Sequence, residues 1–369
     1  MNLLKDKKYL FIILIITSIF VGCNDKSDEE IKIGFIAGLS GKYSNLGSGV
    51  RDGLLLAFDE VNYKIDNKKI KIIQKDDMQN KDEAKKAITS LIKNNVKLIV
   101  GNTTSSMTAI SLDAIKNKKD ILLFSATASS NDFTGKDDNF IRVQLEQSAK
   151  KHIKAVNYLI ENNYKKVYLI YDSSNMSYVN GYKNIFQKLF ISKGGENFVG
   201  SSDINNEYKD ILNDLNTKEY DMILVVANSI DSANIIQYIR LNKINKKIFS
   251  SGWSKTRNFI QNGGKAVEGV LFSTSYDEQS KDKYYIKFLN SFKNKYNSLP
   301  SESAVQGYEV GKIIIKNLKI SSNFETLKTR ILNIKEYRGV QGNIIFDKYG
   351  DIEKEYFMMT IKDSKYIKL

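Results

Sequence analysis

The stretch that decides the fold runs from residue 31 to residue 125, and it opens with the apolar segment 31–38, IKIGFIAG. Three more segments of strand length follow: 69–75 (KIKIIQK), 97–101 (KLIVG) and 121–125 (ILLFS). Amphipathic stretches of helical length separate them, at about 48–62, 81–94 and 105–117. This alternation with short connections predicts right-handed crossovers and a parallel sheet with helices on both faces.

The same alternation starts again after residue 147. Strands are expected at 166–171, 196–201, 221–227, 246–251 and 269–275, and helices at 148–162, 179–193, 207–217 and 231–242. One sheet that held every strand would be unusually large, so the sequence predicts two doubly wound α/β lobes. The tail adds expected helices near 280–296, 302–318 and 324–333, and a hairpin from Gly342 to Lys362 that turns at 348–351.

Composition excludes several classes of protein. The 369 residues are 42% hydrophobic and 27% charged, which argues against disorder and against a polytopic membrane protein. One Cys rules out an internal disulfide, and one His disfavours a His-containing triad or a multi-His metal site, so no metal and no cofactor are expected. That histidine, His152, stands among Lys150, Lys151 and Lys154 and is expected on the surface.

The charge balance points to a solvated surface rather than to a nucleic-acid partner. The formal charge of +14 comes from 56 basic and 42 acidic residues, and the basic ones are scattered singly or in pairs. No basic face for nucleic acid is evident. A Lys-rich surface favours anionic membrane surroundings in a general way.

The N-terminus has the pattern of a secretory signal. Three lysines (Lys5, Lys7 and Lys8) precede an apolar run at 10–20, which is too short to span ~30 Å of hydrocarbon comfortably. The run ends at Val21-Gly22-Cys23, which resembles the lipobox of bacterial lipoproteins. The resemblance implies that residues 1–22 are removed, that Cys23 is lipidated and that 23–30 is a tether, which places the body outside the cytoplasm, anchored to the bacterial cell membrane. The alternative is an uncleaved anchor with a chance cysteine.

Small hydroxylated residues follow two neighbouring strands of the first predicted sheet. Thr104 and Ser105 begin a helix after strand 97–101, and Thr127 and Ser129 follow strand 121–125. Amide groups at a helix start and nearby hydroxyls suit a carboxylate ligand, although simple N-capping is the favoured explanation of one such turn taken alone. Since parallel strands end at the same edge of a sheet, the two turns together favour a binding site.

Longer segments of the chain resemble the type I periplasmic binding proteins of the branched-chain amino acid (Leu/Ile/Val-binding) class. They are 31–62 (IKIGFIAGLSGKYSNLGSGVRDGLLLAFDEVN), 72–92 (IIQKDDMQNKDEAKKAITSLI), 96–109 (VKLIVGNTTSSMTA), 121–130 (ILLFSATASS), 171–182 (YDSSNMSYVNGY), 250–264 (SSGWSKTRNFIQNGG) and 337–351 (YRGVQGNIIFDKYGD). The resemblance implies a clamshell with hinge crossovers near 145–149, 273–277 and 338–342. The implied lobes are 31–147 plus 275–339 and 148–274 plus 340–369.

The resemblance also implies site residues. The ligand carboxylate should meet the Ser105 hydroxyl, the Thr127 main chain and Ser129, and Tyr178 should supply an aromatic surface from the second lobe. Leu46 and Asn228 stand where the family has aromatic residues.

One departure from the family pattern bears on the ligand. An acid that pairs with the ligand ammonium is replaced by Gly252-Trp253-Ser254. Our hypothesis is that Trp253 lines an apolar part of the pocket and that the ligand is a carboxylate without an α-ammonium. Asp172 or Asp231 could instead supply the missing charge.

The predicted function is therefore ligand capture without catalysis. The resemblance implies a monomeric, lipid-anchored solute-binding protein of an ABC importer, which closes its lobes around an apolar amino acid or a related organic acid. Its expected partners are the small-molecule ligand, the permease and ATPase subunits and the membrane. A membrane-tethered ligand sensor for a signalling partner is the alternative.

Overall fold

The computed structural model describes residues 30–369. The expected signal peptide at 1–22, the lipidation site Cys23 and all of the expected tether except Glu30 lie outside the described residues. Within the described part, no helix combines the length and the apolar character needed to cross a bilayer.

The first lobe is built on a six-stranded sheet in the order β2-β3-β1-β4-β5-β6. Its strands are β1 (Glu30–Ala37), β2 (Lys64–Ile65), β3 (Lys68–Asp76), β4 (Leu98–Gly101), β5 (Leu122–Ser125) and β6 (Phe140–Arg142). All neighbours pair in parallel except β2 with β3. The helices that connect these strands are α2 (Ser44–Asp59), α3 (Lys81–Lys93) and α4 (Ser105–Ile115).

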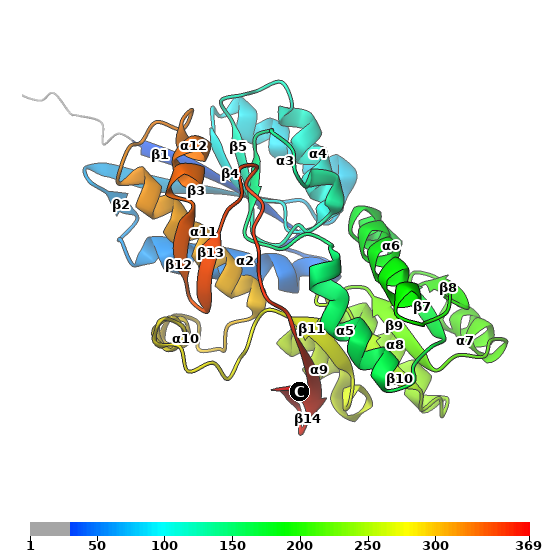
Figure 1. Ribbon diagram of the computed structural model, residues 1–369. Coiled ribbons are helices and arrows are strands. Elements are labelled where there is room, and N and C mark those ends of the chain that lie inside the picture. Colours follow the sequence, from blue (N-terminus) through cyan, green and yellow to red (C-terminus); the bar gives the residue numbers. More distant parts are fainter. Residues whose placement is uncertain (1–29) are drawn as a thin grey trace, which may run out of the picture.

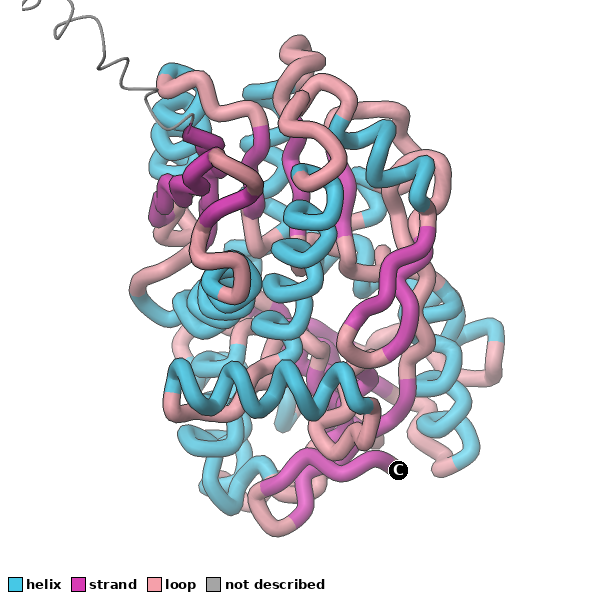
Figure 2. The backbone as a smooth tube through the Cα atoms, turned by 90° about the vertical axis from the view of Figure 1, so that its left-hand side faces the viewer, coloured by secondary structure: helices cyan, strands magenta, loops and turns pink. Residues whose placement is uncertain are grey.

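The second lobe is built on a seven-stranded sheet in the order β15-β14-β11-β10-β9-β7-β8. Its parallel strands are β7 (Val167–Tyr171), β8 (Gly200–Asp203), β9 (Met222–Val226), β10 (Lys247–Ser250) and β11 (Leu271–Thr274), and an antiparallel hairpin of β14 (Phe357–Lys362) and β15 (Lys365–Lys368) extends one edge. Its helices are α5 (Ala149–Glu161), α6 (Met176–Ser192), α7 (Tyr208–Asn216), α8 (Ser229–Leu241) and α9 (Arg257–Gly263). Figure 1 shows the two lobes as separate groups of elements, and Figure 2 shows each group of strands covered by helices.

The chain returns to the first lobe after β11. It forms α10 (Lys283–Tyr296), α11 (Glu302–Leu318), α12 (Leu327–Ile334) and a hairpin of β12 (Glu336–Gly339) and β13 (Gly342–Ile345). Helices α2 and α11 touch closely because glycine stands at their contact. A Cβ at Gly53 would lie 1.8 Å from the Ala304 carbonyl oxygen, and one at Gly307 would lie 2.1 Å from the Val50 carbonyl oxygen.

The prediction of two doubly wound α/β lobes is confirmed, and the long helices begin and end within a few residues of their expected positions. The predicted hairpin from Gly342 to Lys362 is wrong. Strand β13 pairs with β12, β14 pairs with β11 and β15, and a single bridge between Phe346 and Ile352 closes the expected turn. The two halves part because Ile344, Phe346 and Ile352 pack into the core of the first lobe.

The exact lobe boundaries stay a proposal. The chain crosses between the two sheets at 143–148, between β6 and α5, and at 275–282, between β11 and α10. Because residues 344–352 pack in the first core, we place the third crossover at 353–356 rather than at 338–342.

The expectation for His152 is also wrong, because its side chain is 1% exposed. Its ring nitrogen Nε2 lies 3.0 Å from Gln147 Oε1, and its ring meets the edges of Tyr182 and Phe186. Burial, together with the charge of Lys151, holds the pKa of His152 well below its ordinary value. The buried positions His152, Ala155, Val156 and Leu159 recur with the helical period, so one face of α5 packs inward despite its many lysines.

Candidate functional site

Both sheets reverse their winding direction next to the cleft. The chain leaves β1 for β3 on one side and then for β4 on the other, and it leaves β7 for β8 and then for β9 in the same way. At such a switch point the loops after the carboxyl ends of the strands part and leave room for a ligand. The cleft therefore brings the two switch points together.

A cavity of about 70 Å³ lies between the lobes at this place. This is room for a compact ligand rather than for one water. Seven of the eight residues predicted for the site line it: Leu46, Thr104, Ser105, Thr127, Ser129, Tyr178 and Trp253. The structure thus brings together residues that five separate elements and turns contribute.

The start of α4 forms one wall of the cavity. The Ser105 hydroxyl oxygen accepts hydrogen bonds from the amides of Ser129 (3.2 Å) and Ser130 (3.1 Å), which ties α4 to the turn after β5. A hydroxyl that accepts two bonds still has its own proton to donate, and no acceptor for that proton occurs among residues 30–369. The Thr104 hydroxyl, in contrast, donates to Gln79 Oε1 at 2.8 Å. Of the two side chains, Ser105 is the one free to donate to a carboxylate.

The turn after β5 is held in shape by its own side chains. Thr127 Oγ1 donates to the Thr103 carbonyl oxygen at 2.6 Å, and Ser129 Oγ accepts from Gln147 Nε2 at 2.8 Å. Since the Thr127 side chain is engaged, this residue can offer its main chain to a ligand, as the sequence comparison implied. The Thr127 hydroxyl therefore fixes the backbone around the cavity, whereas the Ser129 hydroxyl, which only accepts, keeps its own proton to donate.

Aromatic rings form the wall on the side of the second lobe. Trp253 meets the edge of Tyr178, with ring centroids 5.8 Å apart and planes at 75°. Tyr178 is 7% exposed, and burial raises the pKa of its phenol, so it is neutral. Leu46 adds an aliphatic contact from the first lobe. This wall suits an apolar or aromatic part of a ligand.

Asn228 does not line the cavity, in contrast to the prediction. Its side-chain oxygen caps α8 by accepting from the amides of Ile230 (3.0 Å) and Asp231 (3.1 Å), and its Nδ2 donates to Asp172 and Asp231. Asp172 and Asp231 are not among the lining residues either. The idea that one of them replaces the acid missing at Trp253 gains no support from this placement and stays a hypothesis.

These acids instead hold the two lobes together. Lys42 of the first lobe forms an ion pair with Asp231 at 2.7 Å, and the Tyr43 hydroxyl donates to Ser174 Oγ at 2.9 Å. Next to the cavity the amide of Ser106, at the start of α4, donates to Asn175 Oδ1 at 3.0 Å. The described structure is accordingly the closed form, in which both lobes touch across the cleft.

Sequence reasoning missed the charged and amide groups of the cavity. Lys151, Lys255, Glu302 and Gln306 all line it, as do Gln144 and Tyr356. Lys255 is paired with Glu278 at 3.1 Å. The helical period could have found Lys151, because it lies one turn before the buried Ala155 on α5. No sequence signal could have found Glu302 and Gln306, because α11 lies far along the chain from the other walls.

Lys151 is the most unusual of these groups. It is 6% exposed, and within the described chain its ammonium has no ion pair and no hydrogen bond; its contact is with the ring of Tyr356, 5.4 Å from the centroid. Burial lowers the pKa of Lys151 to about 8, although the charges of Glu302 and Glu146 act to raise it.

In residues 30–369 no group of three or more His, Cys, Asp or Glu side chains could hold a metal ion.

Two lobes that share one cavity, with strand ends and helix starts directed into it, define a two-lobed binding protein. The model of the family described as "Periplasmic binding protein" matches residues 30–365. The chain therefore belongs to the periplasmic binding protein family, whose members bind small solutes outside the cytoplasm and are not enzymes.

Known relatives agree with this assignment. The Leu/Ile/Val-binding protein BraC3 of Rhizobium johnstonii is 22% identical over 342 residues, which is 89% of this chain and 91% of that protein. A leucine-binding protein, LivK, from Thermotoga maritima superposes with a TM-score of 0.83 at 21% identity, over 92% of this chain and 97% of that one. A solute-binding protein from R. palustris in complex with benzoate superposes with a TM-score of 0.82 at 17% identity. The superposition covers 92% of this chain and 95% of that one. The resemblance to type I periplasmic binding proteins is confirmed.

Proposed function

We propose that the protein captures a small carboxylate-bearing solute for an ABC importer by closing its two lobes around it. The observation that carries this proposal is the Ser105 hydroxyl, which is held by the Ser129 and Ser130 amides and retains its proton for a ligand in the cavity. A carboxylate placed there would also meet the start of α4, where the helix dipole favours negative charge. The ligand biases an equilibrium between open and closed forms, and no bond is made or broken.

The class of ligand follows from the walls of the cavity. The aromatic wall of Tyr178 and Trp253 suits an apolar or aromatic body, and the α4 wall suits the carboxylate. BraC3 and LivK carry names that refer to leucine, isoleucine or valine, and the R. palustris protein was solved with benzoate. An apolar amino acid or a related organic acid is therefore the proposed ligand.

A thermal-shift and calorimetric screen tests this proposal. The panel is leucine, isoleucine, phenylalanine, benzoate and the deaminated acids of the same size. A ligand that binds only the native state raises the melting temperature. At a free ligand concentration a hundred times the dissociation constant, it adds ~2.7 kcal/mol to the free energy of unfolding. If amino alcohols or amides without a carboxylate stabilise the protein and no carboxylic acid does, the proposal is wrong.

The lipid anchor at Cys23 belongs to the same proposal. The apolar run at 10–20 and the Gly22-Cys23 junction support it. We expect the wild-type protein to sediment with membranes and the Cys23→Ser variant to be released or left unprocessed. Mass spectrometry of the mature N-terminus decides the matter, because an unmodified Cys23 within an intact chain would contradict lipidation.

The role in import is tested by uptake. We expect deletion of the protein to abolish uptake of the radiolabelled ligand, and reintroduced Ser105→Ala to restore less of it than wild type does. Normal uptake in the deletion strain would favour the sensory role instead.

A further inference from the structure

A second group of polar residues lines the cavity where the chain crosses between the lobes. Gln144 lies in the first crossover, Thr274 ends β11 just before the second, and Tyr356 lies in the third. Lys151, in the first turn of α5, and Gln306, one turn into α11, border the same cavity. The α4 wall and the aromatic wall use none of these five residues.

Lys151 brings an unpaired positive charge to this group. Its ammonium lies over the Tyr356 ring at 5.4 Å and contacts no carboxylate of the described chain. Buried lysines are rare unless they are paired, because removing an ammonium from water is costly. A charge held in this way in the wall of a binding cavity indicates that the partner is the ligand.

Gln306 brings an unused donor. The residue is 2% exposed, and its Nε2 is buried without a hydrogen-bond partner in the described structure. Buried amide groups almost always have a partner. Gln306 lies one helical turn after Glu302, so both side chains fall on the face of α11 that borders the cavity.

The oxygen acceptors of Glu302 and Gln144, which also line the cavity, are bonded to other donors. The two oxygens of Glu302 accept from the hydroxyls of Thr274 (2.6 Å) and Ser275 (3.2 Å). Gln144 Oε1 accepts from the Tyr356 hydroxyl at 3.1 Å. None of these oxygens is bonded to the Lys151 ammonium or to the Gln306 amide nitrogen, so both donors lack an acceptor in the described structure.

We infer that Lys151 and Gln306 form a second subsite that binds an anionic group of the ligand, so that the solute is a small dicarboxylate. This inference rests on the proposed function, which places the first carboxylate at Ser105. A second carboxylate offers two negatively charged oxygens, one for the Lys151 ammonium and one for the Gln306 amide. The side chain of an aliphatic amino acid would leave both donors without a partner.

Matched pairs of acids test the inference by titration calorimetry at pH 7. Hexanoate is compared with adipate, and 4-methylbenzoate with terephthalate, because each pair exchanges a methyl group for a carboxylate. We expect the dicarboxylate to bind roughly tenfold more tightly or better, as a charge-assisted hydrogen bond provides. Equal or weaker binding of both diacids overturns the second subsite and leaves the proposed function standing. If no acid of either kind binds, the proposed function fails as well.

Variants assign the effect to the two residues. Lys151→Met should remove most of the preference for the diacid, by roughly tenfold, because it weakens the diacid far more than the monoacid. Gln306→Leu should reduce the same preference by a smaller factor. Lys154→Met, an exposed position on the same helix, is the matched control for the loss of one charge and should keep the preference. A preference for the diacid that survives Lys151→Met would overturn the assignment.

Discussion

The indole ring of Trp253 in the second lobe stacks on the ring of Tyr43 in the first lobe, with centroids 6.3 Å apart and planes at 14°. The contact spans the cleft and can exist only when the lobes are closed. Trp253 also lines the cavity, so a single side chain contacts both the opposite lobe and the site of the ligand. It is the only tryptophan in the 369 residues.

Intrinsic fluorescence should therefore report closure directly. We expect a saturating ligand to shift the Trp253 emission to the blue, because closure brings Tyr43 over the indole ring and removes water. Tyr43→Leu should reduce the shift. Tyr238→Leu, which alters an aromatic pair between α7 and α8 outside the cavity, is the control and should leave the shift intact. Ligand binding seen by calorimetry without any change in emission would contradict closure at this contact.

Loss of the ion pair between Lys42 and Asp231 should weaken ligand binding without removing it. Because the lysine is partly exposed, the pair contributes ~0.2 to 1 kcal/mol to the closed form. The apparent dissociation constant should rise about 1.4- to fivefold in Lys42→Met, since a smaller fraction of the protein is closed. Asp231→Asn and the double variant complete a mutant cycle, and the coupling should fade at high salt. Additive effects of the two substitutions would show that the pair contributes nothing.

Ser105→Ala should lower both affinity and stability. Loss of a hydroxyl bonded to a charged carboxylate costs ~1.5 to 3 kcal/mol, which is roughly tenfold or more in affinity. The Ser129 and Ser130 amides also lose their acceptor, so the free energy of unfolding should fall by ~1 to 3 kcal/mol.

A second serine on α4 separates the two effects. Ser111 is fully buried, donates to Asn102 Oδ1 at 2.6 Å and does not line the cavity. Ser111→Ala should therefore lower stability and leave affinity unchanged. Calorimetry and urea unfolding measure both variants, and an unchanged dissociation constant in Ser105→Ala would remove Ser105 from the site.

Lys151→Met should stabilise the ligand-free protein at pH 7. Burial lowers the pKa of Lys151 in the folded state to about 8 from 10.5, so below pH 8 the protein bears the full cost of the buried charge. A shift of this size corresponds to a cost of ~3 kcal/mol, which methionine removes.

The sign of the pH dependence follows from proton binding. Between pH 8 and 10.5 the unfolded chain holds a proton that the folded Lys151 has lost, so wild-type stability rises relative to the variant. The facing groups Glu302, Glu146, Arg142 and Tyr356 are the same in both proteins. Urea unfolding at pH 7 and pH 10 measures the difference, and a variant less stable than wild type at pH 7 would contradict an unpaired buried ammonium.

Adipate binding should weaken as the pH rises above about 8. Binding requires the ammonium form of Lys151, and the protonated fraction falls through its pKa of about 8. The affinity should then drop by up to ~tenfold for each pH unit, until the pKa of the complex is reached. Hexanoate serves as the internal control, because it does not need Lys151. Parallel pH profiles for the two acids would exclude this role of Lys151.

The fold could be predicted because its signals are local. Each buried strand is a short apolar run, and Ser105 and Thr127 follow such runs directly, so their meeting at one sheet edge follows from parallel pairing alone. The hairpin at the end of the chain could not be predicted in the same way. Its strands are short, and the choice of partner depends on cores formed by distant segments.

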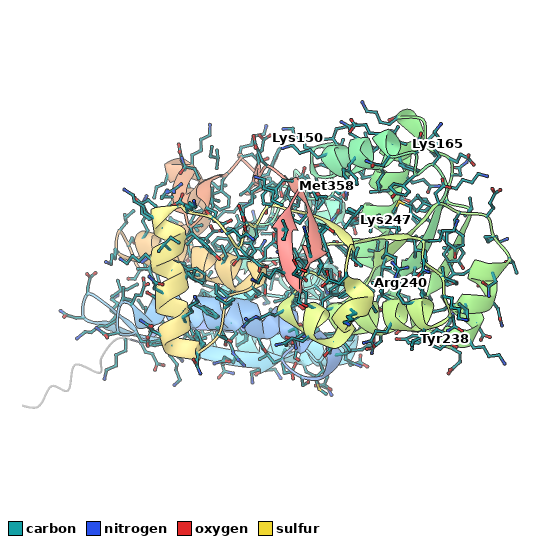
Figure 3. All side chains as sticks on the ribbon, turned by 90° about the horizontal axis from the view of Figure 1, so that it is seen from below. Lys150, Lys165, Tyr238, Arg240, Lys247 and Met358 are labelled. Carbon is teal, nitrogen blue, oxygen red and sulfur yellow. The ribbon has the colours of Figure 1, made fainter. Side chains whose placement is uncertain are left out.

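Most of the polar residues that line the cavity could not be predicted from the sequence. Lys151 stands among other lysines and looks like part of a solvated face, although the period of α5 turns it inward; its neighbour Lys150, labelled in Figure 3, lies on the outside. Gln306 lines the cavity because α11 packs against α2, and this packing places the start of α11 next to the cleft. Asn228 is the opposite case, since asparagine is a preferred N-cap residue and its capping role was predictable.

Gln144, Thr274 and Tyr356 belong to the cavity wall and also lie in or beside the three segments that must bend when the lobes part. A ligand in the cavity therefore contacts the hinge segments between the lobes directly. A molecule slightly too long for this part of the cavity would bind and prevent the two lobes from closing fully. Such compounds would block uptake rather than be transported, and they would reveal themselves by binding without the blue shift of Trp253.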